Sequence, residues 1–413
     1  MAGAGHVIIG ASLTGAKAAE ELRAAGYTGP VTLIGEEEER PYERPPLSKQ
    51  YLLGADPREK AFVHEPGWYA EHDVDLRLGV RATAVDPAAH TVTLGEESLR
   101  YERLLLATGS RVRRLDIPGE ELSNVRYLRS LPDADSLLAA LPAARRVVVI
   151  GAGWIGLEGA AAARAHGAEV TVVDLDRAPL RRVLGDEVAA VFTALHRAHG
   201  VDFRFESSVR EFRGDDSGTV TGVLLDDGTE LPADLVLVGV GVTPATELAE
   251  AAGLAVDNGV VVDQSLCTSD PDIFAAGDVA AVDHPSLGRR IRVEHWSNAL
   301  DGGPAAARAM LGKHVRYDRV PYFFTDQYER GMEYAGWVET GGYERVVFRG
   351  DPSGPFLAFW VAGARVLAAM NMDLWDVQDD LQALVRAGWT GRTVDEKALA
   401  DPDVPLPDLI RTY

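Results

Sequence analysis

Two short glycine-rich turns constrain the fold of this 413-residue chain more than any other feature. Each follows an apolar, β-branched run that is typical of a buried strand and precedes an alanine-rich stretch that is typical of a helix. The first turn has the form G-x-S-x-x-G and the second has the complete form G-x-G-x-x-G. The motif residues are Gly10, Ser12 and Gly15 in the first turn, and Gly151, Gly153 and Gly156 in the second. Strand, turn and helix in this order predict a βαβ unit with a phosphate-binding turn, present twice in the chain.

An acidic residue follows the next predicted strand of both units. Glu36 lies just beyond the apolar run 31–34, and Asp174 directly follows the run 169–173. A carboxylate at the end of this strand accepts hydrogen bonds from ribose hydroxyls. Glu36 and Asp174 are therefore predicted to bind the ribose of two dinucleotides.

The duplication extends beyond the two βαβ units. Residues 99–109 and 231–241 each place an acidic residue before an apolar strand that ends in glycine. The composition of the sequence changes after Pro321, where aromatic residues cluster and the run 356–361 favours antiparallel strands. A predicted helix over 377–387 follows. The predicted fold class is α/β, with two tandem Rossmann-like nucleotide-binding domains and a C-terminal α+β domain.

Charge and cysteine content exclude several classes of function. The formal net charge of −22 argues against a nucleic-acid partner. The single cysteine, Cys267, excludes an intrachain disulfide, a redox-active thiol pair and a thiolate cluster, and no metal site is predicted. Since no uncharged apolar run is long enough to span a membrane and the N-terminus lacks the basic start of a signal peptide, we expect a cytoplasmic protein without membrane association.

The chemistry of the two turns follows from the helix start. Unpaired backbone N–H groups and the positive end of the helix dipole attract a pyrophosphate. Two dinucleotide sites in a chain without a thiol pair suggest a flavin at one site and a nicotinamide at the other, so FAD and NAD are the predicted cofactors.

Five further motifs carry a resemblance to a known family. They are R-P-Y-E-R-P-P-L-S-K at 40–49, A-T-G at 107–109, A-A-G-D at 275–278, E-H-W-S-N-A-L at 294–300 and T-D-Q-Y at 325–328. With these motifs the chain resembles, along essentially its whole length, the NADH-dependent ferredoxin reductases. These are FAD flavoproteins that serve bacterial cytochrome P450 and Rieske oxygenase systems.

The resemblance implies a three-domain organisation of the glutathione-reductase type, with three-layer nucleotide-binding domains. Residues 1–112 and 244–321 would form a discontinuous FAD-binding domain. Residues 113–243 would form an inserted NAD-binding domain, and residues 322–413 a C-terminal reductase domain.

The resemblance also implies two sets of cofactor-binding residues. The predicted FAD-binding residues are Gly10, Ser12, Thr14, Gly15, Glu36, Arg44, Pro46, Lys49, Ala82, Ala107, Thr108, Gly109, Arg129, Gly277, Asp278 and Trp296. The predicted NAD-binding residues are Gly151, Gly153, Trp154, Ile155, Gly156, Glu158, Asp174, Arg182, Val240 and Gly241.

Lys49 and Glu158 are the candidate catalytic residues. In the family this lysine pairs with the glutamate of the second glycine motif, and a cation near the flavin would stabilise its anionic reduced form. The alternatives are a surface role for Lys49 and a helix-dipole role for Glu158. Trp154 is either an aromatic gate over the nicotinamide or an ordinary packing residue.

The predicted route of the electrons follows from the missing cysteines. Disulfide reductases of similar fold carry a C-x-x-x-x-C pair where this chain has the motif P-P-L-S-K, residues 45–49. Reduced FAD must therefore pass electrons to an external acceptor, without covalent catalysis and without an essential general base.

The preferred nicotinamide is predicted from charge. Asp174 would accept from the 2′-hydroxyl of NADH and repel the 2′-phosphate of NADPH. Arg177, Arg181 and Arg182 follow closely and could weaken this preference.

The resemblance names the partners as a [2Fe–2S] ferredoxin and, through it, a cytochrome P450 or Rieske oxygenase, with the reductase a monomer or weak homodimer. Such ferredoxins are acidic, so docking would need a local basic patch. The family often has tryptophan where this chain has Phe324, which leaves the docking aromatic open. The candidate patch residues are Arg289, Arg290, Arg292, Arg308, Arg330 and Arg345. For any one of these arginines, a solvated surface role is the favoured alternative.

Two other functions compete with this interpretation. One is an NADH-dependent flavoprotein that reduces a small molecule of the monodehydroascorbate or quinone type. The other is an NADH-sensing flavoprotein like apoptosis-inducing factor, although the acidic sequence lacks the basic character that such a role would favour.

Overall fold

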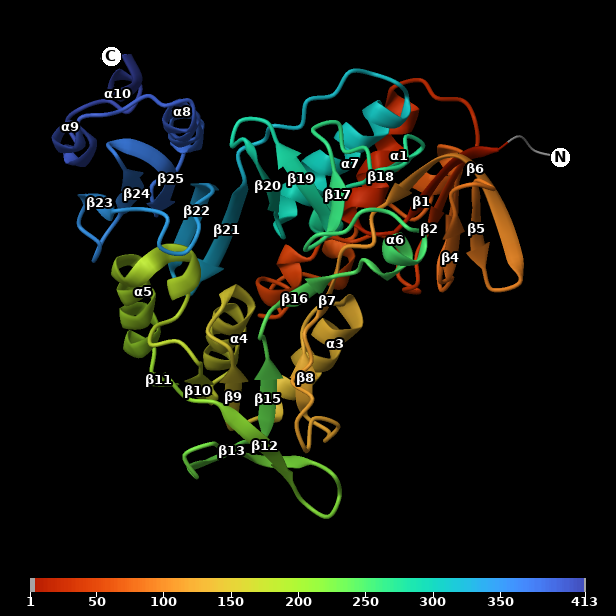
Figure 1. Cartoon of the computed structure of the whole chain (residues 1–413). Coiled ribbons are helices and arrows are strands. Elements are labelled where there is room, and N and C mark those ends of the chain that lie inside the picture. The colour runs from red at the N-terminus through yellow and green to blue at the C-terminus, as the bar shows by residue number, and fades with distance from the viewer. Residues whose placement is uncertain (1–3, 412–413) are drawn as a thin grey trace. The chain divides into compact units, whose positions relative to one another are not determined.

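The computed structural model describes residues 4–411, which form two compact units (Figure 1). The described part of the first unit comprises residues 4–43, 58–111 and 243–321, and that of the second comprises residues 44–57, 112–242 and 322–411. The chain passes from one unit to the other five times, and two of these passages lie in the short strands β7 (Ser110–Val112) and β16 (Val242–Pro244). No helix among residues 4–411 has both the length and the apolar character needed to cross a membrane.

The first unit is built on a sheet in the order β3-β2-β1-β6-β5-β4, with β18 paired to β6. The ten-residue strand β6 serves two parts of the sheet: its start pairs antiparallel with β5, and its later residues pair in parallel with β1 and β18. The bounds are β1 (Gly5–Ile9), β2 (Val31–Ile34), β3 (Val74–Arg77), β4 (Ala84–Asp86), β5 (Thr91–Leu94), β6 (Glu97–Leu106) and β18 (Ile273–Ala275).

The remaining elements of the first unit surround this sheet. A second sheet has the order β17-β19-β20. The bounds of the other elements are α1 (Leu13–Ala24), η2 (Arg58–Ala61), α2 (Trp68–Glu71), α6 (Glu247–Ala251), β17 (Val260–Val262), η4 (Gly277–Val279), β19 (Ala280–His284), β20 (Arg289–Arg292) and α7 (Trp296–Met310).

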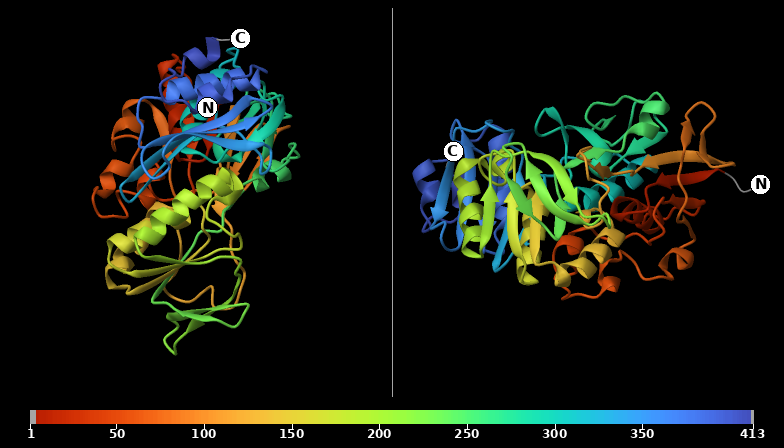
Figure 2. Two further views of the ribbon diagram at one scale, coloured as in Figure 1. Left: turned by 90° about the vertical axis from the view of Figure 1, so that its left-hand side faces the viewer. Right: turned by 90° about the horizontal axis from the view of Figure 1, so that it is seen from below.

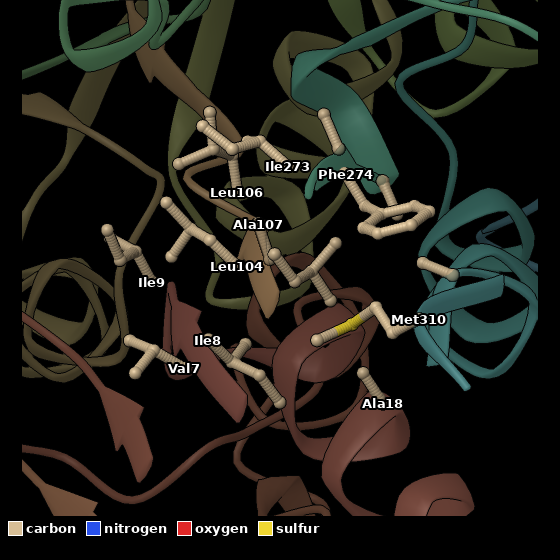
Figure 3. Packing of buried hydrophobic residues seen from close by; sticks show 14 of the residues in the cluster. Val7, Ile8, Ile9, Ala18, Leu104, Leu106, Ala107, Ile273, Phe274 and Met310 are labelled. Carbon is tan, nitrogen blue, oxygen red and sulfur yellow. The ribbon is translucent and has the colours of Figure 1, made fainter. Parts of the chain in front are cut away.

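The core of the first unit lies between the parallel strands and the helices α1 and α7. Strand β1 is buried along its whole length, which agrees with the apolar run in the sequence. Figure 3 shows Met310 of α7 and Ala18 of α1 in the same apolar cluster as Ile8 of β1. The two helices approach closely because Gly303 lacks a Cβ, which would collide with the carbonyl oxygen of Thr14.

The second unit contains a five-stranded parallel sheet in the order β11-β10-β9-β15-β8. This order matches β3-β2-β1-β6-β18 of the first unit, so the predicted duplication is confirmed at the level of the fold. The strands are β8 (Val125–Tyr127), β9 (Arg146–Ile150), β10 (Glu169–Val173), β11 (Val201–Arg204) and β15 (Leu235–Val238). The associated helices are η1 (Pro45–Ser48), α3 (Leu131–Ala140), η3 (Leu141–Ala143), α4 (Trp154–Ala165) and α5 (Arg181–Ala198).

A small antiparallel sheet, β12-β13-β14, is inserted between β11 and β15 in the sequence. Its strands are β12 (Val209–Gly214), β13 (Val220–Leu225) and β14 (Glu230–Pro232). Figures 1 and 2 show it beyond the ends of the parallel strands β9 and β15, away from the second glycine turn.

The C-terminal part of the second unit is an antiparallel sheet in the order β21-β22-β25-β24-β23. Its strands are β21 (Tyr322–Gln327), β22 (Arg330–Gly336), β23 (Arg345–Gly350), β24 (Phe356–Ala362) and β25 (Arg365–Met372). The helices α8 (Gln378–Trp389), α9 (Glu396–Ala400) and α10 (Asp408–Arg411) follow. The predicted antiparallel strands and the helix near 377–387 are confirmed.

Strand β24 is more buried than an alternating half-exposed strand. All residues from Phe356 to Val361 are buried, because β24 lies between β23 and β25 in a sheet that packs against α8. Trp360 also reaches the start of α5, where its indole N–H donates to the carbonyl oxygen of Leu184 at 3.1 Å.

Candidate functional site

The two glycine turns have the same backbone construction. Gly10 and Gly151 adopt φ angles of +121° and +98°, which favour glycine. A Cβ on Gly15 would collide with the carbonyl oxygen of Gly10, and a Cβ on Gly156 would collide with that of Gly151. The first and third glycines of each motif are therefore required by the fold of the turn itself.

The same close approach links each turn to the end of the neighbouring strand. A Cβ on Gly10 would collide with the carbonyl oxygen of Ala107, after β6. A Cβ on Gly151 would collide with that of Gly239, after β15, which leads into Val240 and Gly241. The structure thus places the A-T-G segment, residues 107–109, against the first glycine turn. It places Gly239, which precedes Val240 and Gly241, against the second glycine turn.

Both helix starts fit a dinucleotide phosphate. Ser12 and Gly153 occupy the N-cap positions of α1 and α4, neither cap makes a side-chain hydrogen bond, and neither first turn contains an acidic residue. The positive ends of both helices are therefore available to an anionic ligand. A Cβ on Gly153 would have no neighbour within 4 Å, so the space beside the second turn is open to a ligand group.

The other predicted FAD-binding residues of the first unit lie in two local groups. Gly277 has a φ of +77°, and a Cβ there would lie 2.5 Å from the hydroxyl oxygen of Thr14, so these two residues are adjacent. Asp278 follows Gly277 in η4. Trp296 lies at the start of α7, a helix that contacts η4, and its indole N–H donates to the Glu43 carboxylate at 3.1 Å.

The remaining predicted residues of the first unit have contacts of their own. The Thr108 hydroxyl donates to the carbonyl oxygen of Ala245 at 2.8 Å, and Gly109 has a φ of +67°. Ala82 is buried in the apolar core. Glu36 is exposed, with an oxygen 3.8 Å from the Arg81 guanidinium.

Asp174 lies directly beside the second glycine turn. Its Oδ2 accepts from the backbone N–H of Ala152 at 2.5 Å, and its Oδ1 accepts from that of Asp176 at 2.7 Å. A carboxylate has further lone pairs, so Asp174 can accept from a ribose hydroxyl in addition. Arg182 is held by Asp176, with 2.6 Å between the charged atoms.

The other two arginines near Asp174 are neutralised by one carboxylate. Asp186 accepts from Arg177 at 2.6 Å and from Arg181 at 2.7 Å. These hydrogen bonds lower the pKa of Asp186 below its usual value. All three arginines that could hold a 2′-phosphate are therefore paired with acids.

Lys49 and Glu158 meet inside the second unit, as the resemblance implies. The Lys49 ammonium lies 2.8 Å from Oε1 of Glu158, whose side chain is only 3% exposed. Ser48 donates to Oε2 of the same carboxylate, and Thr325 donates to Oε1 at 2.6 Å. Three donors thus compensate the burial of this carboxylate, since hydrogen bonds to charged groups contribute about 1.5–3 kcal/mol each.

The segment that carries Lys49 is fixed to the second unit. Prolines 45 and 46 begin the short helix η1, and Lys49 directly follows it. The Arg44 guanidinium donates to the carbonyl oxygen of Arg129, and the Tyr51 hydroxyl donates to Asp135 on α3. Arg44, Pro46, Lys49 and Arg129 are thus brought together, as predicted FAD-binding residues of the second unit.

Aromatic residues pack beside the Lys49–Glu158 pair. The Lys49 ammonium lies 5.2 Å from the centroid of the Phe324 ring. Trp154 packs against Phe192 and Phe323, with ring centroids 5.9 and 4.7 Å apart. Ile155, the next residue on α4, is 39% exposed. These contacts account for Trp154 as a packing residue, and its role as a gate stays a prediction.

Three buried polar residues of this site were not among the predicted site residues: Ser48, Thr325 and Gln327. The sequence contained a signal for them, because Ser48 belongs to the P-P-L-S-K motif and the other two to T-D-Q-Y. Both motifs supported the family resemblance without a role for these side chains.

The six candidate docking arginines do not form a patch of free positive charge. Five have acidic partners: Arg290 pairs with Asp257 and Asp283, Arg292 with Glu294, Arg308 with Glu21, Arg330 with Asp373, and Arg345 with Glu344 and Glu396. The first four candidates belong to the first unit and the last two to the second.

Comparison with known proteins gives a consistent result. Residues 5–303 match the family described as pyridine nucleotide-disulphide oxidoreductase, and residues 322–410 match the family described as reductase C-terminal. The chain is 41% identical to the ferredoxin–NAD(+) reductase component of the anthranilate 1,2-dioxygenase system of Burkholderia cepacia, covering 97% of this chain and 98% of that protein. It is 39% identical to putidaredoxin reductase of Pseudomonas putida, covering 98% and 96%.

A solved structure extends this similarity to three dimensions. The covalent complex of putidaredoxin reductase with putidaredoxin contains a chain that superimposes with a TM-score of 0.93 at 38% identity. The match covers 100% of this chain and 99% of that one.

Proposed function

Because this chain belongs to the pyridine nucleotide-disulphide oxidoreductase family, and within it to the ferredoxin–NAD(+) reductases, we propose that it is an FAD-dependent NADH:ferredoxin oxidoreductase. It would take a hydride from NADH and deliver single electrons to a [2Fe–2S] ferredoxin that serves a cytochrome P450 or a Rieske oxygenase.

One observation carries this proposal. Where disulfide reductases of this fold have a C-x-x-x-x-C pair, this chain has the segment 45–49, and Ser48 and Lys49 of this segment both donate to the buried carboxylate of Glu158. The lone cysteine, Cys267, lies in the other unit, where burial and neighbouring acids raise its pKa. The chain therefore has no thiol relay, and its electrons must leave to another protein or molecule.

Bound FAD would supply the conversion between two-electron and one-electron transfer. The first glycine turn offers the N–H groups of α1 to its pyrophosphate, and Ser12 adds a hydroxyl there. Glu36 follows β2 and would accept from the adenosine ribose. Thr14 and the adjacent Gly277–Asp278 segment complete the set in the first unit.

NADH would be bound by the second turn. Gly153 leaves the backbone at the start of α4 open to the pyrophosphate, and Asp174 would accept from the adenosine ribose. Asp176 and Asp186 keep the nearby arginines from attracting a 2′-phosphate. Lys49 supplies a positive charge that would stabilise the anionic reduced cofactor, and Glu158 holds the Lys49 ammonium in place.

The proposal is tested by the turnover of cytochrome c with NADH, with and without an added [2Fe–2S] ferredoxin. We expect turnover to depend strongly on ferredoxin. Fast reduction of a quinone or monodehydroascorbate without ferredoxin would instead support a small-molecule reductase. Near-zero turnover with a long-lived reduced flavin would support an NADH-sensing flavoprotein.

We place this reaction in the cytoplasm, where NADH is produced by catabolic dehydrogenases. We also expect the protein to be a monomer or weak homodimer, which light scattering at increasing protein concentration would measure.

A further inference from the structure

A line of buried polar side chains runs from Glu158 to α5 within the second unit. The function proposed above assigns no role to the side chains beyond Glu158. The Thr325 hydroxyl donates to Oε1 of Glu158 at 2.6 Å and accepts from the Gln327 amide nitrogen at 3.1 Å. Oε1 of Gln327 lies 2.7 Å from Nε2 of His196, on α5. Nδ1 of His196 lies 3.3 Å from the hydroxyl of Tyr328. Glu158, Thr325, Gln327 and His196 are each at most 4% exposed, so water does not compete with these bonds.

The chemistry of each group allows only one direction for these hydrogen bonds. The Glu158 carboxylate can only accept, so Thr325 must donate its single hydroxyl proton to it. The Thr325 oxygen must then accept from the Gln327 NH2 group, which turns the Gln327 carbonyl oxygen toward His196. Because that oxygen can only accept, Nε2 of His196 must carry the ring proton. Nδ1 is then the acceptor for Tyr328.

The state of His196 agrees with this direction. Burial lowers the pKa of His196 to about 4, so the ring is neutral near pH 7 and carries one proton only. This chain of hydrogen bonds does not conduct protons, because a carboxamide such as Gln327 passes a proton only through an unfavourable tautomer. Its effect is to fix orientations.

We propose that Thr325, Gln327 and His196 are positioning residues, whose one-way hydrogen-bond chain holds the Glu158 carboxylate in the orientation that binds Lys49. The hydrogen-bond chain connects β21 and α5 to Glu158 in the second turn of α4, so the C-terminal sheet would contribute to the chemistry of the second glycine turn. This inference rests on the proposed function, because that function assigns Lys49 and Glu158 to the reduction of the flavin by NADH.

The test compares two pairs of variants of the FAD-loaded protein in rapid mixing with NADH. Thr325→Val removes the hydroxyl at nearly constant volume, and Thr325→Ser keeps it. His196→Met removes the donor, and His196→Gln keeps an N–H near the position of Nε2. We expect flavin reduction to be about tenfold slower in Thr325→Val, which loses a hydrogen bond to the charged Glu158. His196→Met loses the bond that orients Gln327 and should be slower by up to about the same factor. The Ser and Gln variants should stay within about twofold of the parent. The NADH concentration at half-saturation should stay unchanged, because the pyrophosphate and ribose of NADH are assigned to the second glycine turn and to Asp174, which these substitutions leave unaltered.

A double variant separates positioning from simple structural support. If His196 acts through Thr325, the combined Thr325→Val and His196→Met variant reduces its flavin no more slowly than Thr325→Val alone. Multiplied effects of the two substitutions would overturn the proposal. So would rates that follow the melting temperatures of all four single variants instead of the retained hydrogen-bond donor.

A spectroscopic measurement on the unaltered protein needs no variant to fold. In a nitrogen-15 NMR spectrum of the histidines at neutral pH, we expect His196 as the tautomer protonated at Nε2. The Nδ1 tautomer, or a charged ring, would overturn the proposal. All these readouts omit ferredoxin, so a protein that fails to reduce ferredoxin would contradict the proposed function and leave this inference to be decided by its own results.

Discussion

The two glycine turns share one backbone but differ in what surrounds them. Seven residues after the first glycine of each turn, the first copy has Lys17 and the second has Glu158. Lys17 is partly exposed and pairs with Glu20 on its own helix. Glu158 is buried and receives donors from two other segments, 44–57 and β21. The difference shows that the duplication supplied the phosphate-binding fold, and that segments outside the module supplied the partners of Glu158.

The first experiment asks whether the two turns bind different ligands. Gly15→Val and Gly156→Val each place a side chain against a backbone carbonyl of the same turn. We expect Gly15→Val to be purified without flavin, and Gly156→Val to be purified with flavin that NADH no longer reduces. The measurement is the visible absorption spectrum before and after NADH. Gly153→Ala is the control, because its Cβ has space, and it should retain flavin. Loss of flavin from Gly156→Val in a folded protein would contradict the assignment.

The second experiment compares Lys49, which pairs with Glu158 of the second copy, with Lys17, which lies on the helix of the first copy. Lys49→Met removes the charge that pairs with Glu158, and we expect flavin reduction by NADH to slow by at least about tenfold. Lys17→Met removes a partly exposed lysine from the equivalent module and should change the rate by less than about twofold. Stopped-flow absorbance gives both rates, and an unchanged rate for Lys49→Met would remove this lysine from the mechanism.

The third experiment concerns the arginines near Asp174, the acidic residue that follows β10 in the second copy. Asp186→Asn weakens the hold on Arg177 and Arg181, so kcat/KM for NADPH should rise about two- to fivefold relative to NADH. Asp202→Asn is the matched control, since Asp202 also pairs with an exposed arginine, Arg204, but on β11. Equal NADPH turnover in parent and Asp186→Asn would show that these arginines lie away from the adenosine ribose.

The smallest effect concerns the first strand of each module. Four residues before the first glycine, the first copy has His6 where the second has Val147. Burial lowers the pKa of His6 to about 4, and neither ring nitrogen has a hydrogen-bond partner. The unfolded chain therefore takes up a proton below pH about 6.5, whereas the folded chain takes it up only near pH 4. The free energy of unfolding consequently decreases as the pH is lowered from about 6.5 to about 4.

Replacing His6 by Phe keeps the stacking on Tyr27, whose ring lies 4.2 Å away, and removes this proton uptake. Between pH 7 and pH 5 the free energy of unfolding of His6→Phe should fall by up to about 2 kcal/mol less than that of the parent. Urea unfolding at the two pH values measures this, with exposed His314→Phe as the control. An equal loss in His6→Phe and the parent would contradict the assigned pKa.

The sequence predicted the elements of both modules because each depends on local signals. Residues 31–34 form β2 as expected, and the helices after the two turns begin at Leu13 and Trp154. The candidate site was harder to predict from the sequence. Ser48 and Thr325 reach Glu158 from 110 and 167 residues away, and no local pattern specifies such a meeting. Likewise, the apolar run 356–361 cannot reveal that its strand is covered by neighbouring elements.

Family resemblance recovered part of what local signals could not. It implied the pairing of Lys49 with Glu158, which the structure confirms as an ion pair. Their part in catalysis, the cofactor contacts and the three-domain boundaries stay predictions. The basic docking patch also stays a prediction, and a count of arginines along the chain does not show that Arg290 and Arg330 are paired with aspartates.

The most direct test of the account is an anaerobic titration of the purified protein with NADH in the presence of excess oxidised [2Fe–2S] ferredoxin, followed by visible absorption. We expect a yellow protein that reduces two molecules of ferredoxin for each NADH oxidised. A colourless protein that FAD cannot reconstitute, or a flavin that NADH bleaches while the ferredoxin stays oxidised, would contradict it.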